Sequence, residues 1–193
     1  MTKDITEKCM QSDFKWSVTK FISIASQFKS VLDIGCGTGR ILKKIKAKKR
    51  YGIDVCQAVI DKARENNNVC LGDPDFFCFD LKYLDKCWRT RVQLVYGFDI
   101  IEHFTKPHAL QLLKTIEDIV THQIILFIPV GNHPQTKDDR GFKNDYYQTH
   151  RSIWYPQDME ELGYKVWYYP NWHKSFVNKE KGAMWCQKIF KGV

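Results

Sequence analysis

The sequence predicts an α/β fold, in which one doubly wound and mostly parallel sheet is covered by helices on both faces. Two observations support this prediction. Short apolar segments alternate with amphipathic segments through the first two thirds of the chain, and a glycine-rich turn follows the first apolar segment. Strands and helices that alternate in this way form parallel sheets, and such sheets bind ligands at the carboxyl ends of their strands.

The length and composition fit one globular domain, and we expect it to span residues 1–193. Hydrophobic residues make up 44% of the chain and charged residues 27%, which is enough apolar material for a sizeable core. No run of eighteen apolar residues occurs, and Met1–Met10 lacks the apolar core of a signal peptide. Seven cysteines without a C-x-x-C pair argue against a disulfide framework or a thiolate zinc site. We therefore expect a cytoplasmic protein without a membrane span.

The first half of the chain starts with a helical segment in residues 1–30, where apolar groups recur at helical spacing from 13 to 28. The apolar run 31–34 precedes glycines and reads as a buried strand. The next expected elements are a helix at 40–49, a strand at 51–55, a helix at 58–65 and strands at 76–79 and 93–97. Asparagines 66–68 end the helix that precedes them.

In the second half, Pro107 at a first-turn position and Thr105 as a cap predict a helix over 107–120. A strand at 123–128 follows. Residues 129–155 are polar, aromatic and long for a connection, so we expect a functional loop on the substrate side. The last expected elements are a helix at 156–162 and two strands at 164–169 and 183–190.

The glycine-rich turn carries the strongest motif, which begins at Asp33 and continues through Gly35, Gly37 and Gly39. Glycines without a Cβ let a cofactor approach the backbone. The dinucleotide pattern G-x-G-x-x-G fails because Arg40 occupies its third glycine position, and no Gly-Lys-Ser/Thr of a P-loop follows. Asp54 ends the next strand, where a carboxylate can accept both hydroxyls of a ribose.

In order and spacing, residues 31–104 resemble the class I S-adenosylmethionine (SAM)-dependent methyltransferases. The resemblance implies a Rossmann-like sheet of seven strands, with one antiparallel strand near the C-terminus, and SAM as the cofactor. It also implies that Gly35 and Gly37 line the methionine part, that Asp54 holds the ribose, that Val55 packs on the adenine, and that Asp80 or Phe79 meets the adenine edge. Asp33, whose negative charge suits the ammonium and sulfonium of SAM, and Phe98 complete the expected cofactor-binding set. Asp73 and Asp75 lie near Asp80 and are alternatives for its role.

The segment after the fourth strand holds Asp99, Glu102 and His103. It resembles the D-x-x-E-H segment of small-molecule O-methyltransferases, such as those of ubiquinone biosynthesis, and the similar segment of small-RNA 2′-O-methyltransferases. Spacing of i, i+3 and i+4 puts the three side chains on one face of a helical turn. The resemblance implies either local hydrogen bonding or binding of a divalent metal, Mg²⁺ or Mn²⁺, which His133 or His150 would complete.

The long loop contains a second candidate, His150, in the segment from Thr149 to Trp154. The pattern H-R-S-x-W resembles a segment that is frequent in methyltransferases of small molecules and sugars. A histidine titrates in the range that a general base needs, so His103 and His150 are the candidate catalytic residues. For Trp154 we expect packing rather than chemistry.

These features predict methyl transfer from SAM to a hydroxyl of a small molecule or glycan. The net charge of +8 favours the alternative, a ribose 2′-O-methyltransferase of RNA. The run Lys43–Arg50 is better explained as a solvated helix face than as a nucleic-acid patch. A second alternative is a non-catalytic SAM-binding subunit, although the acidic and glycine residues of the turn are all present.

Overall fold

The sheet of this protein has seven strands in the order β3-β2-β1-β4-β5-β7-β6. The computed structural model describes residues 16–66, 74–138, 141–170, 172 and 182–190. The strands are β1 (Ser30–Ile34), β2 (Lys49–Asp54), β3 (Asp75–Cys78), β4 (Val92–Phe98), β5 (Val120–Val130), β6 (Lys165–Tyr169) and β7 (Gly182–Ile189). Strands β1 to β5 pair in parallel, and β7 is antiparallel to both of its neighbours. The predicted fold class is confirmed.

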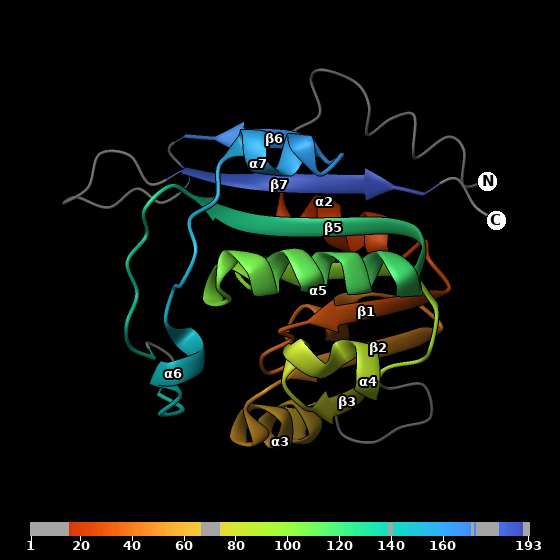
Figure 1. Cartoon of the computed structure of the whole chain (residues 1–193). Coiled ribbons are helices and arrows are strands. Elements are labelled where there is room, and N and C mark those ends of the chain that lie inside the picture. The colour runs from red at the N-terminus through yellow and green to blue at the C-terminus, as the bar shows by residue number, and fades with distance from the viewer. Residues whose placement is uncertain (1–15, 67–73, 139–140, 171, 173–181, 191–193) are drawn as a thin grey trace.

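Helices cover both faces of the sheet (Figure 1). Helices α2 (Val18–Ala25) and α3 (Gln57–Asn66) pack on one face, and α4 (Leu84–Cys87), α5 (Lys106–Ile119) and α7 (Pro156–Glu161) on the other. Three 3-10 turns, η1 (Leu42–Lys44), η2 (Leu81–Tyr83) and η3 (Ile101–His103), and the short helix α6 (Asp145–Gln148) lie in connections. In the described part of the chain, no helix combines the length and apolar character that crossing a membrane requires.

Each central strand is buried on both sides because the two helical layers form separate cores. Along β4, Leu94 and Tyr96 belong to the core beneath α2, whereas Val95 belongs to the core beneath α5. Phe21 of α2 and Trp185 of β7 complete the first core, and their exposed fractions are 0% and 1%. This two-sided burial explains why the strands read as continuous apolar runs rather than alternating ones.

The prediction of a helix over residues 40–49 is wrong. Only η1 is helical there, and Ile45 has extended dihedral angles of −81° and 130°. Ile45 and Ala47 are buried, while the lysines between and beside them are exposed, so every second residue faces the core. A period of two belongs to extended chain, and the backbone N–H of Lys46 donates to Ser26 Oγ at 3.0 Å. The lysines are solvated as expected, but not on a helix.

Three further details of the fold differ from the expectation. Strand β5 continues to Val130, so the long loop begins at Gly131 rather than at residue 129, and it contains α6. Thr105 does occupy the N-cap of α5, but its hydroxyl pairs with His108 Nδ1 at 3.1 Å and makes no cap bond to the backbone. The link between β3 and β4 holds η2 and α4, which the apolar spacing does not reveal.

The long loop is closed at its base. Gly131 N donates to Trp154 O at 3.0 Å, so the chain returns to its starting point before α7 begins. The Trp154 side chain is completely buried in the core beneath α5, and its Nε1 donates to Ser152 Oγ at 2.9 Å. Lys106 Nζ lies 3.6 Å from the centre of the Trp154 ring, close enough for a cation–π contact. The expected packing role of Trp154 agrees with this placement.

Replacing Trp154 with Ala should reduce the free energy of unfolding by about 3–5 kcal/mol, because it empties a buried aromatic site. Chemical denaturation monitored by circular dichroism measures the change. The neighbouring variant Tyr155→Ala is the matched control, since that side chain is 51% exposed. Equal stability of the two variants would show that Trp154 does not anchor the loop.

Candidate active site

The glycine turn after β1 folds directly onto the end of β2. The backbone N–H groups of Gly35 and Cys36 both donate to Ile53 O, at 2.8 and 2.9 Å. Gly35 and Gly37 have φ values of +73° and +54°, a region that side chains disfavour. A Cβ on Gly35 would also overlap the side chain of Ile100. The turn therefore requires glycine for its conformation and for its close approach to the loop after β4.

The Asp54 carboxylate is fixed by backbone donors at the end of β2. Its Oδ2 accepts from Gly37 N at 3.0 Å, and its Oδ1 accepts from Cys56 N at 3.0 Å. A carboxylate has about four acceptor sites in all, so it can accept from more than two donors. Asp54 also lines the adjoining cavity, where a ribose could reach it.

Asp33 lies beneath the turn and is only 4% exposed. Tyr96 donates its hydroxyl to Asp33 Oδ2 at 2.8 Å, across the β1–β4 pair in which these two residues are register partners. Burial, and then the charge of Asp54, raise the pKa of Asp33 well above its usual value, although the Tyr96 hydrogen bond acts the other way. A cation beside Asp33 would offset this effect, which fits the ammonium group of SAM.

Tyr96 is a site residue that sequence reasoning missed. Its position in an apolar strand gives it the appearance of a core aromatic, and it is indeed fully buried. The signal that could have found it is the parallel register, which places the residue opposite Asp33 on the neighbouring strand.

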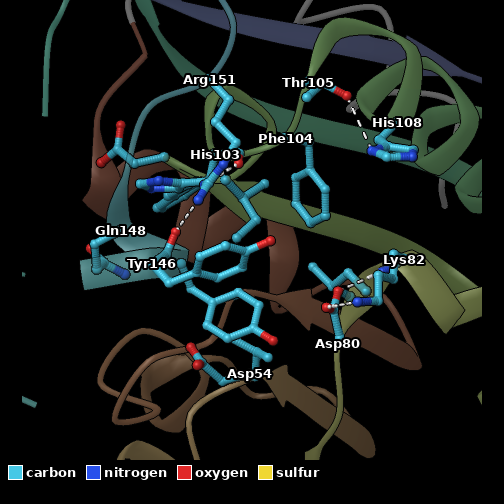
Figure 2. Close-up of a pocket in the computed structure, with 17 residues that line it drawn as sticks. Asp54, Asp80, Lys82, His103, Phe104, Thr105, His108, Tyr146, Gln148 and Arg151 are labelled. Atoms are coloured by element: carbon cyan, nitrogen blue, oxygen red, sulfur yellow. Dashed lines mark hydrogen bonds and ion pairs between the residues drawn. The ribbon is translucent and has the colours of Figure 1, made fainter. Parts of the chain in front are cut away.

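A cavity of about 280 Å³ opens beside Asp54 at the carboxyl edge of the sheet (Figure 2). Its cofactor-side lining includes the predicted residues Gly35, Asp54, Val55, Asp80 and Phe98. Phe79 packs against the core beneath α5 and is not part of the lining. Figure 2 shows Asp54 and Asp80 on one side of the cavity and His103 and Arg151 on the other.

Asp80 also stabilises the start of η2. Its carboxylate accepts from Lys82 N at 3.0 Å at the start of η2, and it pairs with Lys82 Nζ at 3.1 Å. Of the alternatives for the adenosine end, Asp75 lies within β3, and Asp73 lies outside the described residues.

A second cavity of about 510 Å³ lies on the other side of the glycine turn. Asp33 and the turn form one wall, and an aromatic group forms the other, namely Phe98, Phe127, Trp172 and Trp185. Gly35, Phe98 and Asp99 line both cavities, so they mark where the two spaces adjoin. Together the cavities extend from Asp54 and Asp80, past Gly35, to Asp33 and the aromatic wall.

Three of the predicted chemical groups converge beside the first cavity. One ligand atom each of Glu102, His103 and His150 lies within 4.8 Å of the others. The His103 and His150 rings meet edge to face with centres 4.8 Å apart, and His103 lines the cavity. Loops that leave adjacent parallel strands β4 and β5 bring these histidines together. Burial lowers the pKa of His150 and so favours the neutral imidazole, while a hydrogen bond with the backbone of His133 acts the other way.

Glu102 is 1% exposed, and neither carboxylate oxygen has a hydrogen-bond partner of normal geometry among the described residues. Burial, and then the charge of Asp99, raise the pKa of Glu102 well above its usual value, while nearby backbone N–H groups of Glu102 and Ile100 act the other way. A buried carboxylate of this kind favours a proton or a cation, so the cluster fits a divalent metal. Two imidazoles with one carboxylate form a mixed donor set that is compatible with several divalent metals.

Asp99 and His133 do not join this cluster. The helical turn that we expect from Asp99 onward starts only at Ile101, because Asp99 has a φ of +52° and its N–H donates to Phe127 O at 2.9 Å. His133 Nε2 instead contacts Val130 O at 2.9 Å. Of the two histidines that could complete the set, the structure brings His150 to Glu102 and His103.

The H-R-S-x-W segment is bonded to the D-x-x-E-H segment through the backbone. Arg151 N and Ser152 N donate to Glu102 O at 2.7 and 3.1 Å, and Arg151 Nη1 donates to His103 O at 3.0 Å. The H-R-S-x-W segment therefore joins the loop after β5 to the loop after β4. Arg151 is a residue whose role sequence reasoning missed, although it stands inside a motif that we singled out.

A family model and a curated protein each match part of this chain. Residues 31–123 match the family model of a methyltransferase domain. A stretch of 58 residues is 41% identical to an uncharacterized protein of Methanocaldococcus jannaschii, covering 28% of this chain and 26% of that protein. The chain therefore spans only about a quarter of the curated relative that it matches.

Solved structures share the fold at low sequence identity. A SAM-dependent methyltransferase of Clostridium acetobutylicum superposes with a TM-score of 0.66 at 14% identity, over 99% of this chain and 98% of that one. Magnesium protoporphyrin IX methyltransferase of Synechocystis PCC 6803, with bound SAH, gives 0.61 at 12% identity over 98% and 95%. The methyltransferase domain of the bacterial protein CtHen1-CN gives 0.54 at 17% identity over 89% and 97%.

The fold and the cofactor edge define a Rossmann-like methyltransferase domain. The chain contains a class I SAM-dependent methyltransferase domain, as its resemblance to that family implies. Within such a domain, Asp33, Gly35, Gly37 and Asp54 occupy the edge of the sheet at which ligands bind.

Replacing Asp54 with Ala should weaken SAM binding by roughly 10- to 150-fold, because hydrogen bonds to a charged acceptor contribute about 1.5–3 kcal/mol. Gly37→Leu should abolish binding, since the backbone there has a φ of +54° and the residue lines the second cavity. Calorimetry with SAM measures both effects. Asp61→Ala on α3, whose carboxylate side chain is 56% exposed, is the control. Unchanged affinity in a folded Asp54→Ala variant would remove Asp54 from the site.

Proposed function

We propose that the protein transfers the methyl group of SAM to a hydroxyl oxygen of a small molecule or glycan. The observation that carries this proposal is the meeting of His103 and His150 beside the cavity that Asp54 lines, with ring centres 4.8 Å apart. A hydroxyl must lose its proton as the oxygen attacks, and an imidazole at the mouth of the cofactor site can accept that proton. An acceptor that is already deprotonated would need no such base.

The cofactor residues follow from the two adjoining cavities. Asp54 holds the ribose hydroxyls, Val55 and Asp80 border the adenosine, and Asp33 with the glycine turn receives the methionine part. Gly35, Phe98 and Asp99 line both cavities, so these residues would lie nearest to the reactive centre of a bound SAM. When bound, SAM supplies a methyl group that is already activated by its sulfonium.

The remaining chemistry is positioning and proton removal. The chain orients the acceptor oxygen in line with the sulfur–methyl bond, which makes the transfer effectively unimolecular. As the O–CH₃ bond forms and the S–CH₃ bond breaks, the hydroxyl proton passes to His103 or His150. A divalent metal at Glu102, His103 and His150 would instead polarise the hydroxyl and orient a neighbouring oxygen.

Ribose methylation of RNA is the second candidate. The net charge of +8 favours a polyanionic partner, and a ribose offers two adjacent oxygens to a metal held by Glu102, His103 and His150. We rank it second because the lysines from 43 to 49 lie along η1 and the extended segment after it, and none of them lines the first cavity.

A transfer assay with methyl-labelled SAM, offered glycan, metabolite and RNA fractions, tests the acceptor class. We expect label in the glycan or metabolite fraction, and none with Asp54→Ala. Label in RNA alone would overturn the acceptor proposal and favour the ribose. SAM binding without transfer to any fraction would point to a non-catalytic SAM-binding subunit.

Replacing the catalytic base with Ala should lower turnover by roughly 10²- to 10⁴-fold and leave SAM affinity nearly unchanged. We expect this of His103→Ala or His150→Ala. His122→Ala is the control, because His122 lies near the start of β5, at the opposite edge of the sheet from the cavity. Full turnover in both single variants and in the double variant would leave positioning alone as the source of catalysis.

The same variants distinguish a base from a metal ligand. If chelator abolishes activity and added Mn²⁺ or Mg²⁺ restores it, the cluster is a metal site, and Glu102→Gln should then lose the response to metal. If activity survives chelator, the histidine acts as the base.

A further inference from the structure

The long loop crosses the carboxyl edge of the sheet and covers the cofactor residues. In Figure 1, α6 lies beyond the end of the sheet toward which β5 points. Tyr146, Tyr147 and Gln148 of α6 line the first cavity together with Asp54 and Asp80. A smaller cavity of about 80 Å³ separates Gly37 and Asp54 from the loop residues Asp138, Phe142, Asn144 and Gln148. The loop therefore faces the cofactor turn from outside.

Tyr147 occupies the adenosine end of the first cavity. The side chain is partly buried and lines the same cavity as Asp54, Val55 and Asp80. Tyr147 and Asp80 line the same cavity. In agreement with this, burial, and then the charge of the Asp80 carboxylate, raise the pKa of Tyr147, while Lys82 acts the other way. An aromatic ring in this position can pack against a ribose or a purine.

Arg151 holds α6 in place. Its guanidinium donates to three backbone carbonyls, those of His103 at 3.0 Å, Thr149 at 2.9 Å and Tyr146. The guanidinium carbon lies 4.6 Å from the centre of the Tyr146 ring. Only arginine has the planar fork of donors that can join three carbonyls at once. One side chain thus connects the helix that carries Tyr147 with the loop that carries His103.

Further bonds within the loop give α6 a defined conformation. Asp145 Oδ1 accepts from Asp138 N at 2.7 Å, Asp138 Oδ2 accepts from Asn144 N at 3.2 Å, and Thr149 Oγ1 donates to Asp145 O at 2.8 Å. The helix itself has one turn, so these contacts and Arg151 determine where Tyr147 lies.

We propose that Tyr147 is a cofactor-binding residue that packs on the adenosine part of SAM, and that Arg151 is the positioning residue that holds Tyr147 there. The proposal rests on SAM binding at Asp54, as in the proposed function. It adds a consequence for the reaction, because His150 lies between Tyr147 and Arg151 in the chain. Binding of the adenosine therefore also steadies the histidine at the acceptor side.

Calorimetry with S-adenosylhomocysteine and with 5′-methylthioadenosine tests the proposal without any acceptor. Tyr147→Ala should weaken both ligands by about tenfold, since both contain the adenosine that the ring contacts. Tyr147→Phe should bind both ligands with nearly the affinity of the wild type, because it keeps the aromatic ring. Tyr155→Ala, an exposed aromatic at the end of the same loop, is the control.

Arg151→Ala should weaken the two ligands by a similar factor, and Arg151→Lys by less. In the Tyr147→Ala background, Arg151→Ala should add little, because residues that act through one contact are not additive. Arg50→Ala, which removes a bond to Ile45 O from a residue in the first half of β2, is the matched control. Thermal unfolding confirms that each variant is folded.

Three results would overturn the proposal. Unchanged affinity in Tyr147→Ala would show that the ring makes no contact, and tighter binding would show that the ring competes with the cofactor. Additive losses in the double variant would separate Arg151 from Tyr147. If the wild type binds neither ligand, the proposed function fails instead, so the two failures are distinguishable.

Discussion

One carboxylate holds the cofactor edge of this domain together. Asp54 accepts hydrogen bonds from Gly37 in the turn after β1 and from Cys56 in the turn after β2. Next to it, Ile53 O accepts from Gly35 and Cys36, which continues the pairing of the two strands beyond their ends. The glycine turn is therefore an extension of the sheet rather than a free loop. Hydrogen bonds within the chain therefore determine its shape.

The two buried acids at this edge, Asp33 and Glu102, differ in their hydrogen-bond partners. Asp33 has Tyr96 as a fixed donor, whereas the oxygens of Glu102 have no such donor in the described part of the chain. Burial raises the pKa of both, so each site favours a proton or a nearby positive charge. Asp33 faces the cavity on the methionine side, and Glu102 faces the two histidines. The two acids thus lie in different parts of the edge, and the part with Glu102 is the one that we propose for the acceptor.

Sequence patterns predicted the parts of this structure that depend on local spacing. Apolar runs located all seven strands, and the motif around Gly35 and Asp54 located the cofactor edge. The helix at 40–49 failed because alternating lysines near Ile45 and Ala47 can be solvated in either conformation. Tyr147 and Arg151 could not be assigned roles, since their positions follow from contacts between residues nearly fifty apart, such as Arg151 with His103. The convergence of His103 and His150 was predictable because their loops leave adjacent strands.

The closure of the long loop has a consequence for how such domains diversify. A single backbone bond between Gly131 and Trp154 and one buried indole seal its base, so β5 and α7 do not depend on what lies between. Lengthening a loop costs little, about 0.6 kcal/mol for each doubling. Mutation and insertion can therefore rebuild this segment while the sheet keeps its register. The sheet and its glycine turn can then be combined with loops that carry other acceptor-side residues.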